Sequence, residues 1–311
     1  MPKTNSLPKF PFIVAPQISR SRSPVVALES TVITHGLPRP HNLQLALDIQ
    51  SVVRENGAIP ATIAVLDGKV HVGLTDNELE RLATEEVVKK ISLRDFATAI
   101  VKKECGGTTV AGTMFIAHQA GIRVFATGGI GGVHDVGTFD ISTDLHALSN
   151  IPMVVVCAGP KAILDIAATL EYLETMGVPV VGYQTDEVPA FFSRQSGFPV
   201  SVKLDSTAEI VEFANTHWEM GMTSSVLVCQ PLPPDLELPR DKVTDIIQKI
   251  LHEAHDQGIR GQSLTPFLLA RMVELTGGES LAANKLLLLN NARLAAQIVV
   301  AFKMVEKQNS V

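Results

Sequence analysis

The sequence predicts an α/β protein with a three-layer α/β/α arrangement around a mixed, largely parallel central sheet. Short β-branched runs alternate along the chain with longer helical patterns, as in strands joined by crossover helices. The composition, 46% hydrophobic and 19% charged over 311 residues, is enough to bury a sizeable core. Asp67-Gly68 between two apolar runs predicts a two-residue hairpin, which makes part of the sheet antiparallel.

Strands are expected wherever the apolar, β-branched runs are short: residues 24–28, 60–66, 98–101, 124–127, 153–157, 178–183 and 225–229. Helices are expected where helical patterns continue for longer: residues 42–56, 75–88, 108–120, 143–149, 163–176, 207–220, 241–257, and a last pair across 265–305. The proline-rich segment 231–239 lies between a strand and a helix, so it predicts a surface connection within one domain. We therefore expect residues 24–311 to form a single domain behind a loosely ordered N-terminal arm of residues 1–23.

Charge and cysteine content restrict the kind of partner. The formal net charge is −6 and the isoelectric point is near 5.9, which argues against a nucleic acid or an anionic membrane surface. No run of about 18 apolar residues predicts a membrane span. Three cysteines without a CxxC pair predict neither a zinc site nor a disulfide framework. We expect a cytoplasmic protein that binds small molecules, although a basic first segment without acids leaves organellar import open.

Glu29 stands directly after an apolar strand, where the ligands of open α/β sheets bind. Burial at that position would raise the pKa of its carboxyl group and suit it to proton transfer. The alternative is a glutamate that caps a turn or pairs with a lysine.

Lys161 follows the Gly159-Pro160 turn, which leads from a buried strand towards the helix predicted over 163–176. In the first turn of that helix, the positive end of the dipole and desolvation would favour a neutral, nucleophilic amine. The alternative is a lysine turned into solvent.

Three further segments contain residues suited to an anion or a cation. Residues 127–134 (TGGIGGVH) could bring backbone N–H groups close to a small anion, or simply form a tight loop, and they match neither GxGxxG nor a P-loop. Residues 140–144 (DISTD) could hold a divalent cation, or start a helix with Ser142 or Thr143 as the N-cap. Residues 88–95 supply positive charge for a phosphate, or form a charged helix end.

The sequence resembles the pseudouridine-5′-phosphate glycosidase family, also called the indigoidine-synthase-A-like family. The strings that carry the resemblance are VVALESTVITHGLPRPHN, GAIPATIAVLDGKVHVGL, ATGGIGGVH, TFDISTDL, VVVCAGPKAILDIAATLEYLETMGVPVVGYQTDEVPAFF and LTPFLLARMVELTGGESLAAN. The resemblance implies reversible cleavage of the carbon–carbon glycosidic bond of pseudouridine 5′-phosphate to uracil and ribose 5-phosphate. It also implies an α/β/α catalytic domain, a divalent metal, Mn²⁺ in the family, and a homotrimer.

The resemblance also assigns roles to positions of this chain. It places the nucleophilic lysine on Lys161, the proton donor on Glu29 and the metal ligand on Asp140. The remaining positions are implied to contact the substrate: Lys90, Val110, Thr127, His134, Ser142, Thr143, Asp144 and Asn284. Thr127 and His134 match phosphate-side positions, and Asn284 matches a polar active-site asparagine.

The implied chemistry agrees with the unusual positions of Lys161 and Glu29. The leaving atom is a uracil carbon, so a lysine imine at the first sugar carbon would act as the electron sink while a carboxylic acid protonates the base. Asp135 stands where the family usually has an arginine, and the loop before TFDIS is shorter than usual. Two alternatives share some of these residues: a Schiff-base aldolase-type enzyme acting on another phosphosugar, and a non-catalytic phosphosugar-binding protein.

Overall fold

The computed structural model describes residues 12–19, 23–135, 139–259 and 264–308. Within these ranges, eleven strands form one sheet and two more form a small ribbon. The path through the large sheet is β1-β4-β3-β2-β7-β10-β13-β11-β12, and β6 pairs with both β3 and β5. The strands are β1 Ile13–Val14, β2 Val25–Leu28, β3 Ile59–Leu66, β4 Lys69–Val72, β5 Lys89–Ile91, β6 Gly106–Thr108, β7 Val124–Ala126, β8 Val133–Asp135, β9 Asp140–Ile141, β10 Val154–Cys157, β11 Val180–Tyr183, β12 Val202–Leu204 and β13 Val226–Cys229.

The centre of the sheet is parallel and one flank is antiparallel. Strands β3, β2, β7, β10, β13, β11 and β12 pair in parallel along the path. Strand β3 pairs antiparallel with β4 and with β6. Leu66 lies opposite Lys69, so the predicted Asp67-Gly68 hairpin is confirmed. The predicted mixed, largely parallel sheet is confirmed as well.

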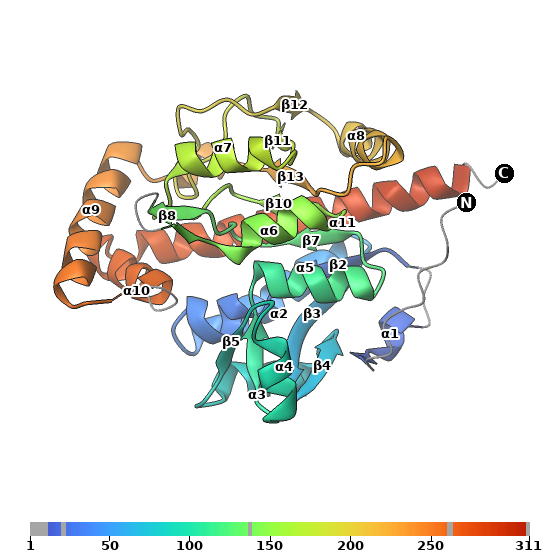
Figure 1. Cartoon of the computed structure of the whole chain (residues 1–311), viewed down its shortest axis with the longest axis horizontal. Coiled ribbons are helices and arrows are strands. Elements are labelled where there is room, and N and C mark those ends of the chain that lie inside the picture. Colours follow the sequence, from blue (N-terminus) through green and yellow to red (C-terminus); the bar gives the residue numbers. More distant parts are fainter. Residues whose placement is uncertain (1–11, 20–22, 136–138, 260–263, 309–311) are drawn as a thin grey trace.

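Helices cover both faces of this sheet. The helical elements are α1 Pro16–Ser19, η1 Val32–Gly36, α2 His41–Glu55, α3 Asp76–Thr84, α4 Phe96–Val101, α5 Val110–Gln119, α6 Thr143–Asn150, α7 Ile166–Thr175, α8 Thr207–Glu219, η3 Pro234–Leu236, α9 Arg240–Asp256, α10 Leu264–Leu275 and α11 Glu279–Gln308. Figure 1 shows α5, α6 and α7 in front of the sheet and the long α11 behind it. The three-layer prediction is therefore confirmed.

Alternation along the central strands produces two separate cores. Val154 and Val156 pack into the core on the α2, α8 and α11 side, whereas Val155 and Cys157 pack into the core on the α5, α6 and α7 side. All four side chains are fully buried. A strand buried on both faces has no polar side to expose, which is why these runs are continuously apolar in the sequence.

Helix α11 is a core helix of this sheet. By length and hydropathy alone, Glu279–Glu306 would pass as a membrane span, but 56% of its most apolar window is buried inside the protein. Ala292, Ala295 and Ala296 are among its fully buried side chains. Small residues there let the helix approach the central strands closely.

Three differences from the sequence-based predictions concern the type or the order of a segment. Residues 98–101, predicted as a strand, belong to helix α4, because a short apolar run carries no periodicity that separates the two. Strand β5 occupies residues predicted as a helix end, and it pairs with β6. Residues 13–14, predicted as part of a loosely ordered arm, form strand β1 on β4, so the arm prediction is wrong for this part.

A tight turn follows β10 and sets the course of the chain towards Lys161. Gly159 has a φ of +85°, and a Cβ placed there would lie 2.2 Å from the Pro189 carbonyl oxygen. Only glycine allows both this backbone conformation and this approach. Gly177, between α7 and β11, has a φ of +67° with no atom within 4 Å of such a Cβ.

We predict that Gly159→Ala destabilises the fold by about 1–3 kcal/mol more than Gly177→Ala, because only the first adds a steric clash to the backbone strain. Both variants share the cost of a left-handed alanine, about 1–2 kcal/mol. Urea unfolding of the two variants and the wild type measures the difference. Equal destabilisation would show that the Pro189 carbonyl does not constrain this turn.

Candidate active site

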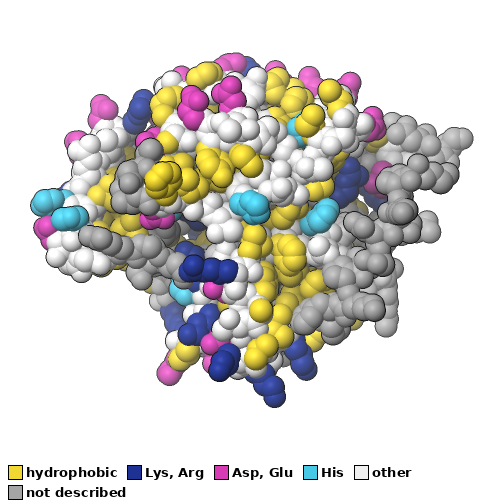
Figure 2. Space-filling model, viewed as in Figure 1, with side chains coloured by type: hydrophobic (Ala, Val, Ile, Leu, Met, Phe, Trp, Pro, Cys, Tyr) yellow, Lys and Arg dark blue, Asp and Glu magenta, His cyan; other side chains and the backbone are white. Residues whose placement is uncertain are grey.

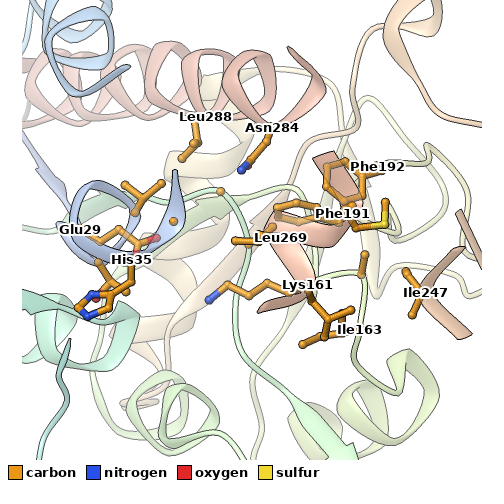
Figure 3. A pocket seen from close by; sticks show the side chains of 18 of the residues that line it. Glu29, His35, Lys161, Ile163, Phe191, Phe192, Ile247, Leu269, Asn284 and Leu288 are labelled. Carbon is orange, nitrogen blue, oxygen red and sulfur yellow. The ribbon is translucent and has the colours of Figure 1, made fainter. Parts of the chain in front are cut away.

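Two adjoining chambers open at the carboxyl ends of the parallel strands β2, β7 and β10. They share four residues along their boundary: Glu29, Thr31, Lys90 and Lys161. One chamber is mainly apolar and contains Phe191, Phe192, Leu268, Leu269, Met272 and Leu288, together with His35 and Asn284 (Figure 3). The other is polar and contains Ser92, Arg94, Thr109, Val110, Gly131, His134, Asp140, Ser142, Thr143 and Asp144. The site thus offers a polar and an apolar compartment on either side of a charged boundary.

Glu29 is held in a buried position at the end of β2. Its side chain accepts a hydrogen bond from the Thr127 hydroxyl, which lies directly after the neighbouring strand β7. Burial raises the pKa of the Glu29 carboxyl group, and the positive charge of Lys161 and the Thr127 hydrogen bond offset only part of this shift. A buried carboxyl group with a raised pKa is suited to donate a proton, as the sequence predicts.

Lys161 lies between β10 and α7, and its side chain extends towards Glu29 (Figure 3). Its backbone N–H donates to the Ile130 carbonyl at 3.0 Å, and Pro160 forms a bridge with Ile130. The segment before α7 therefore runs alongside the glycine-rich loop and is held by it. This pairing brings the Lys161 amine to the chamber boundary.

The prediction that Lys161 lies in the first turn of a helix is wrong. Helix α7 begins at Ile166, and Asp165 is its N-cap, accepting from the Ala168 N–H at 2.9 Å. The Asp165 N–H in turn donates to the Val133 carbonyl, which fixes where the helix starts. The dipole of α7 therefore does not act on Lys161 as predicted. The charged groups near Lys161 include Glu29 and Lys90.

Asp144 joins three segments of the site through its buried carboxylate. One oxygen accepts from the Ala111 N–H at 2.9 Å and the other from the Gly131 N–H at 2.8 Å. A Cβ at Gly131 would lie 2.1 Å from the Ser142 hydroxyl oxygen, so this glycine is needed for close approach. The glycine-rich loop therefore packs against Ser142 and Asp144, and the Gly131 N–H binds the chain's own carboxylate rather than an external anion.

The helix-start interpretation of residues 140–144 is confirmed. Ser142 is the N-cap of α6 and accepts from the Asp144 N–H at 3.2 Å. Thr143 is exposed at the first helical position and, with Ser142, faces the polar chamber. Each oxygen of Asp144 accepts from a backbone N–H group, so this buried carboxylate already has internal partners.

Asp140 lies beside His134 at the mouth of the polar chamber. Its Oδ1 is 3.7 Å from the His134 Nδ1, which is buried without a hydrogen-bond partner in the described part of the chain. Burial lowers the pKa of His134 and so favours its neutral imidazole. Over the described residues, no cluster of three or more His, Cys, Asp or Glu side chains forms a metal site. One carboxylate and one imidazole fit a divalent ion that keeps several waters, and they do not fit a closed protein cage.

Strand β5 brings positive charge to the boundary. Burial, followed by the nearby Lys161 charge, lowers the pKa of Lys90, while Asp144 and Glu29 raise it. Arg94, three residues after β5, lines the polar chamber. The interpretation of residues 88–95 as a charged helix end is therefore wrong, because Lys89–Ile91 is a strand. The other interpretation agrees with the positions of Lys90 and Arg94, which line the polar chamber. Val110 lies at the start of α5 on the same chamber wall.

The comparisons with known proteins identify the family. Residues 14–301 match the model described as indigoidine synthase A-like protein. The chain belongs to this family. It is 52% identical over 284 residues to a pseudouridine-5′-phosphate glycosidase of Geobacillus kaustophilus, covering 91% of this chain and 94% of the relative. It is 51% identical over 290 residues to one of Solibacter usitatus, covering 92% and 97%.

Two solved structures share the fold over nearly the whole chain. An indigoidine synthase A-like protein of Thermotoga maritima superposes with a TM-score of 0.86 at 37% identity, covering 94% of this chain and 97% of that one. The prealnumycin C-glycosynthase AlnA, in complex with ribulose 5-phosphate, superposes with a TM-score of 0.87 at 39% identity, covering 96% and 98%. The resemblance derived from the sequence strings is therefore confirmed.

Two features of this indigoidine-synthase-A-like site could not be located by motif. His35 lies in the π-helical turn η1, where its Nδ1 is 2.7 Å from the Thr34 hydroxyl, and burial lowers its pKa. Phe191 and Phe192 reach the apolar chamber from a loop after β11. Both come from irregular segments, whose course is set by tertiary packing, so the only available signal was the family resemblance of the strings that contain them.

Thr127 does not reach a chamber wall. It is 1% exposed and lies behind Glu29, to which it donates. Asn284, by contrast, projects from α11 into the apolar chamber, as Figure 3 shows. Residues 136–138, part of the shortened loop, lie outside the described residues.

We predict that Lys90→Met raises the pKa of Glu29 further. The Lys90 ammonium favours the charged carboxylate, so its removal makes the protonated acid more stable and moves the titration midpoint to higher pH. Carboxyl ¹³C NMR, with the Glu29 signal assigned from its loss in Glu29→Gln, measures the midpoint. Lys89→Met is the matched control, because Lys89 points to Glu104 at 3.9 Å and is largely exposed. An unchanged midpoint in Lys90→Met would contradict the described electrostatics.

Proposed function

We propose that this chain is a pseudouridine-5′-phosphate glycosidase, which cleaves the carbon–carbon glycosidic bond reversibly through a lysine imine. The observation that carries the proposal is the placement of the buried Glu29 carboxyl group and the Lys161 amine at the boundary between a polar and an apolar chamber. The names of relatives about 50% identical over most of the chain support the same activity.

The two chambers suit the two halves of the substrate. Ribose 5-phosphate would lie in the polar chamber, where Lys90 and Arg94 supply positive charge and Ser142 and Thr143 supply hydroxyl groups. Uracil would lie in the apolar chamber, with its faces against Phe191 and its polar edge towards Asn284. AlnA was solved with ribulose 5-phosphate, a pentose phosphate of the same size, which supports a pentose 5-phosphate in a site of this fold.

The proposed reaction begins at the first sugar carbon. The Lys161 nitrogen, as the free amine, forms a bond to C1′ while the C1′–O4′ bond breaks, and O4′ takes the proton that the nitrogen gives up, which opens the sugar. The nitrogen lone pair then forms the imine as the bond from C1′ to the uracil carbon breaks. The departing electron pair stays on that carbon, which takes its proton from Glu29. Water hydrolyses the protonated imine and releases ribose 5-phosphate and the free amine, and the proton set free in this step returns to the Glu29 carboxylate.

Glu29 suits this step because its environment keeps the proton available. A carboxyl group with an ordinary pKa would be ionised near neutral pH and could not act as the acid. Burial raises the pKa of Glu29 and keeps a larger fraction protonated, while Lys161 limits the rise. An oxygen-protonating pair of carboxylates, as in ordinary glycosidases, is not required when the leaving atom is carbon.

We further propose that Asp140, with His134 beside it, holds a divalent metal ion, Mn²⁺ in the family. When bound, such an ion would supply positive charge at the polar chamber, next to the proposed phosphate end of the substrate. We also propose a homotrimer. Apolar side chains are exposed on the face of the molecule that carries α5 (Figure 2), and Phe115 of α5 is 41% exposed, which supports a contact surface there.

We predict that Lys161→Ala lowers uracil release from pseudouridine 5′-phosphate by at least about a thousandfold, because the covalent step loses its nucleophile. The thermal midpoint should stay within a few degrees, since Lys161 forms bonds to substrate rather than packing contacts. Lys203→Ala, which removes an ion-paired lysine on β12, is the control and should keep full activity. Substantial activity in Lys161→Ala would refute the imine route.

We predict that Glu29→Gln still forms the lysine adduct but releases uracil about 10²–10⁴-fold more slowly, because the amide cannot donate the proton. Borohydride reduction in the presence of ribose 5-phosphate, followed by peptide mass mapping, should place the sugar on Lys161 in both the variant and the wild type. Normal uracil release by Glu29→Gln would assign the proton donor elsewhere. Trapping on another lysine would remove Lys161 from the mechanism.

A further inference from the structure

Asn291 lies on α11, outside the residues that line the two chambers, and its side chain is buried (1% exposed). Its side-chain amide donates to the Thr127 carbonyl at 2.8 Å and approaches the Gly128 carbonyl at 3.4 Å. These carbonyls belong to the first two residues after β7. The Gly128 carbonyl also accepts from the Ala158 N–H at 2.9 Å, so the segment after β7 stays bonded to the turn after β10, and the Asn291 amide adds a side-chain donor to it from α11.

The oxygen of the same side-chain amide makes this arrangement unusual. Asn291 Oδ1 is buried and has no hydrogen-bond partner in the described part of the chain. An unsatisfied buried acceptor is unfavourable, and it calls for an explanation where it occurs. Turning the amide over would place its oxygen against two carbonyl oxygens, so the donor must face the strand end. A leucine would fill the same space without leaving an unpaired oxygen.

Thr127 connects this amide to the acid. Its backbone N–H donates to the Val156 carbonyl at 3.0 Å, its carbonyl accepts from Asn291, and its hydroxyl donates to the Glu29 carboxylate. The backbone of Thr127 is therefore fixed from both sides, which fixes the direction of its hydroxyl. A small shift of this strand end would lengthen the bond to Glu29 directly.

The same helix also presents Asn284 to the apolar chamber. Asn284 and Asn291 are seven residues apart, or nearly two helical turns, so they share one face of α11. Leu287 and Leu288, between them, lie 3.2 Å from a Cβ placed at Gly128. Helix α11 therefore fits closely onto the loop after β7, and Asn291 is the polar contact that sets its register there.

We infer that Asn291 is a positioning residue for Glu29: its amide fixes the strand end after β7 so that the Thr127 hydroxyl points at the carboxyl group. This inference rests on the proposed role of Glu29 as the proton donor. It assigns Asn291 no contact with the substrate. A residue that served only to pack α11 on the sheet would affect stability and leave the acid unchanged.

The test compares Asn291→Leu with Asn290→Leu in assays of uracil release. Asn290 is the matched control, because within the described residues its side chain is bonded to the exposed Arg293, from which it accepts at 2.9 Å, and not to the strand end. We expect Asn291→Leu to lower kcat by about 10- to 100-fold through misplacement of the acid, with KM changed by less than about threefold. Asn290→Leu should keep both constants within about twofold. Asn291→Ala, which leaves space instead of filling it, is the second variant if leucine overpacks the site.

The pH profile separates positioning from a structural role. The Thr127 hydrogen bond favours the ionised carboxylate, so weakening it raises the pKa of Glu29 and moves the alkaline limb of kcat to higher pH. The charged groups that face Glu29 are Lys161, Lys90 and Asp144, and none of them is altered by the variants. The limb is assigned to Glu29 by its absence in Glu29→Gln.

A double-mutant cycle with Thr127→Val completes the test. We expect Thr127→Val to reproduce the kcat loss and the shifted limb, and Asn291→Leu to add less than about twofold in that background. Losses that multiply, or an Asn291→Leu variant with lowered thermal stability but normal kcat and limb, would overturn the inference. A wild-type protein that releases no uracil refutes the proposed function, and with it the basis of this inference. Wild-type turnover with an unaffected Asn291→Leu refutes the inference alone.

Discussion

The burial of the Glu29 carboxyl group beside two lysines is the constraint on which the rest of the site depends. Removing a carboxyl group from water favours its protonated form, whereas Lys161 and Lys90 favour the ionised form. The balance leaves the pKa of Glu29 raised, and the Lys161 amine proposed as the nucleophile lies at the same chamber boundary. Neither group could be moved into solvent without losing this balance, because solvent would screen both effects.

The fold produces this juxtaposition through the ends of three adjacent parallel strands. Strand β2 delivers Glu29, β7 delivers Thr127, and the turn after β10 delivers Lys161. Internal hydrogen bonds then complete the site: Asp144 ties α5 to the glycine-rich loop, and Ile130 holds the backbone of Lys161. The glycines allow this close packing. The Gly131 N–H binds the Asp144 carboxylate and so positions the loop instead of binding an external anion.

The two chambers differ in polarity, so the boundary residues have a polar side and an apolar side. The side of Lys90, Arg94 and Ser142 suits phosphate and hydroxyl groups, and the side of Phe191 and Asn284 suits a planar base, as proposed above. Binding energy from both ends of a substrate would hold its central bond at Glu29 and Lys161, which is how remote contacts assist a bond-breaking step. Helix α11 contributes to the site at two points, since Asn284 reaches the apolar chamber and Asn291 donates to the Thr127 carbonyl behind Glu29.

The sequence by itself determined the α/β class, the hairpin at Asp67-Gly68 and a helix start at Ser142 or Thr143, and it singled out Glu29 and Lys161 as candidates, because each rests on local pattern or on short matching strings. Tertiary structure alone decided the start of α7 at Ile166, the occupation of Asp144 by backbone N–H groups, and the identity of strand β5. The apolar wall and the Asn291 contact also needed it. These features depend on partners far along the chain, and no local pattern records which carbonyl or amide a folded backbone will bring into range.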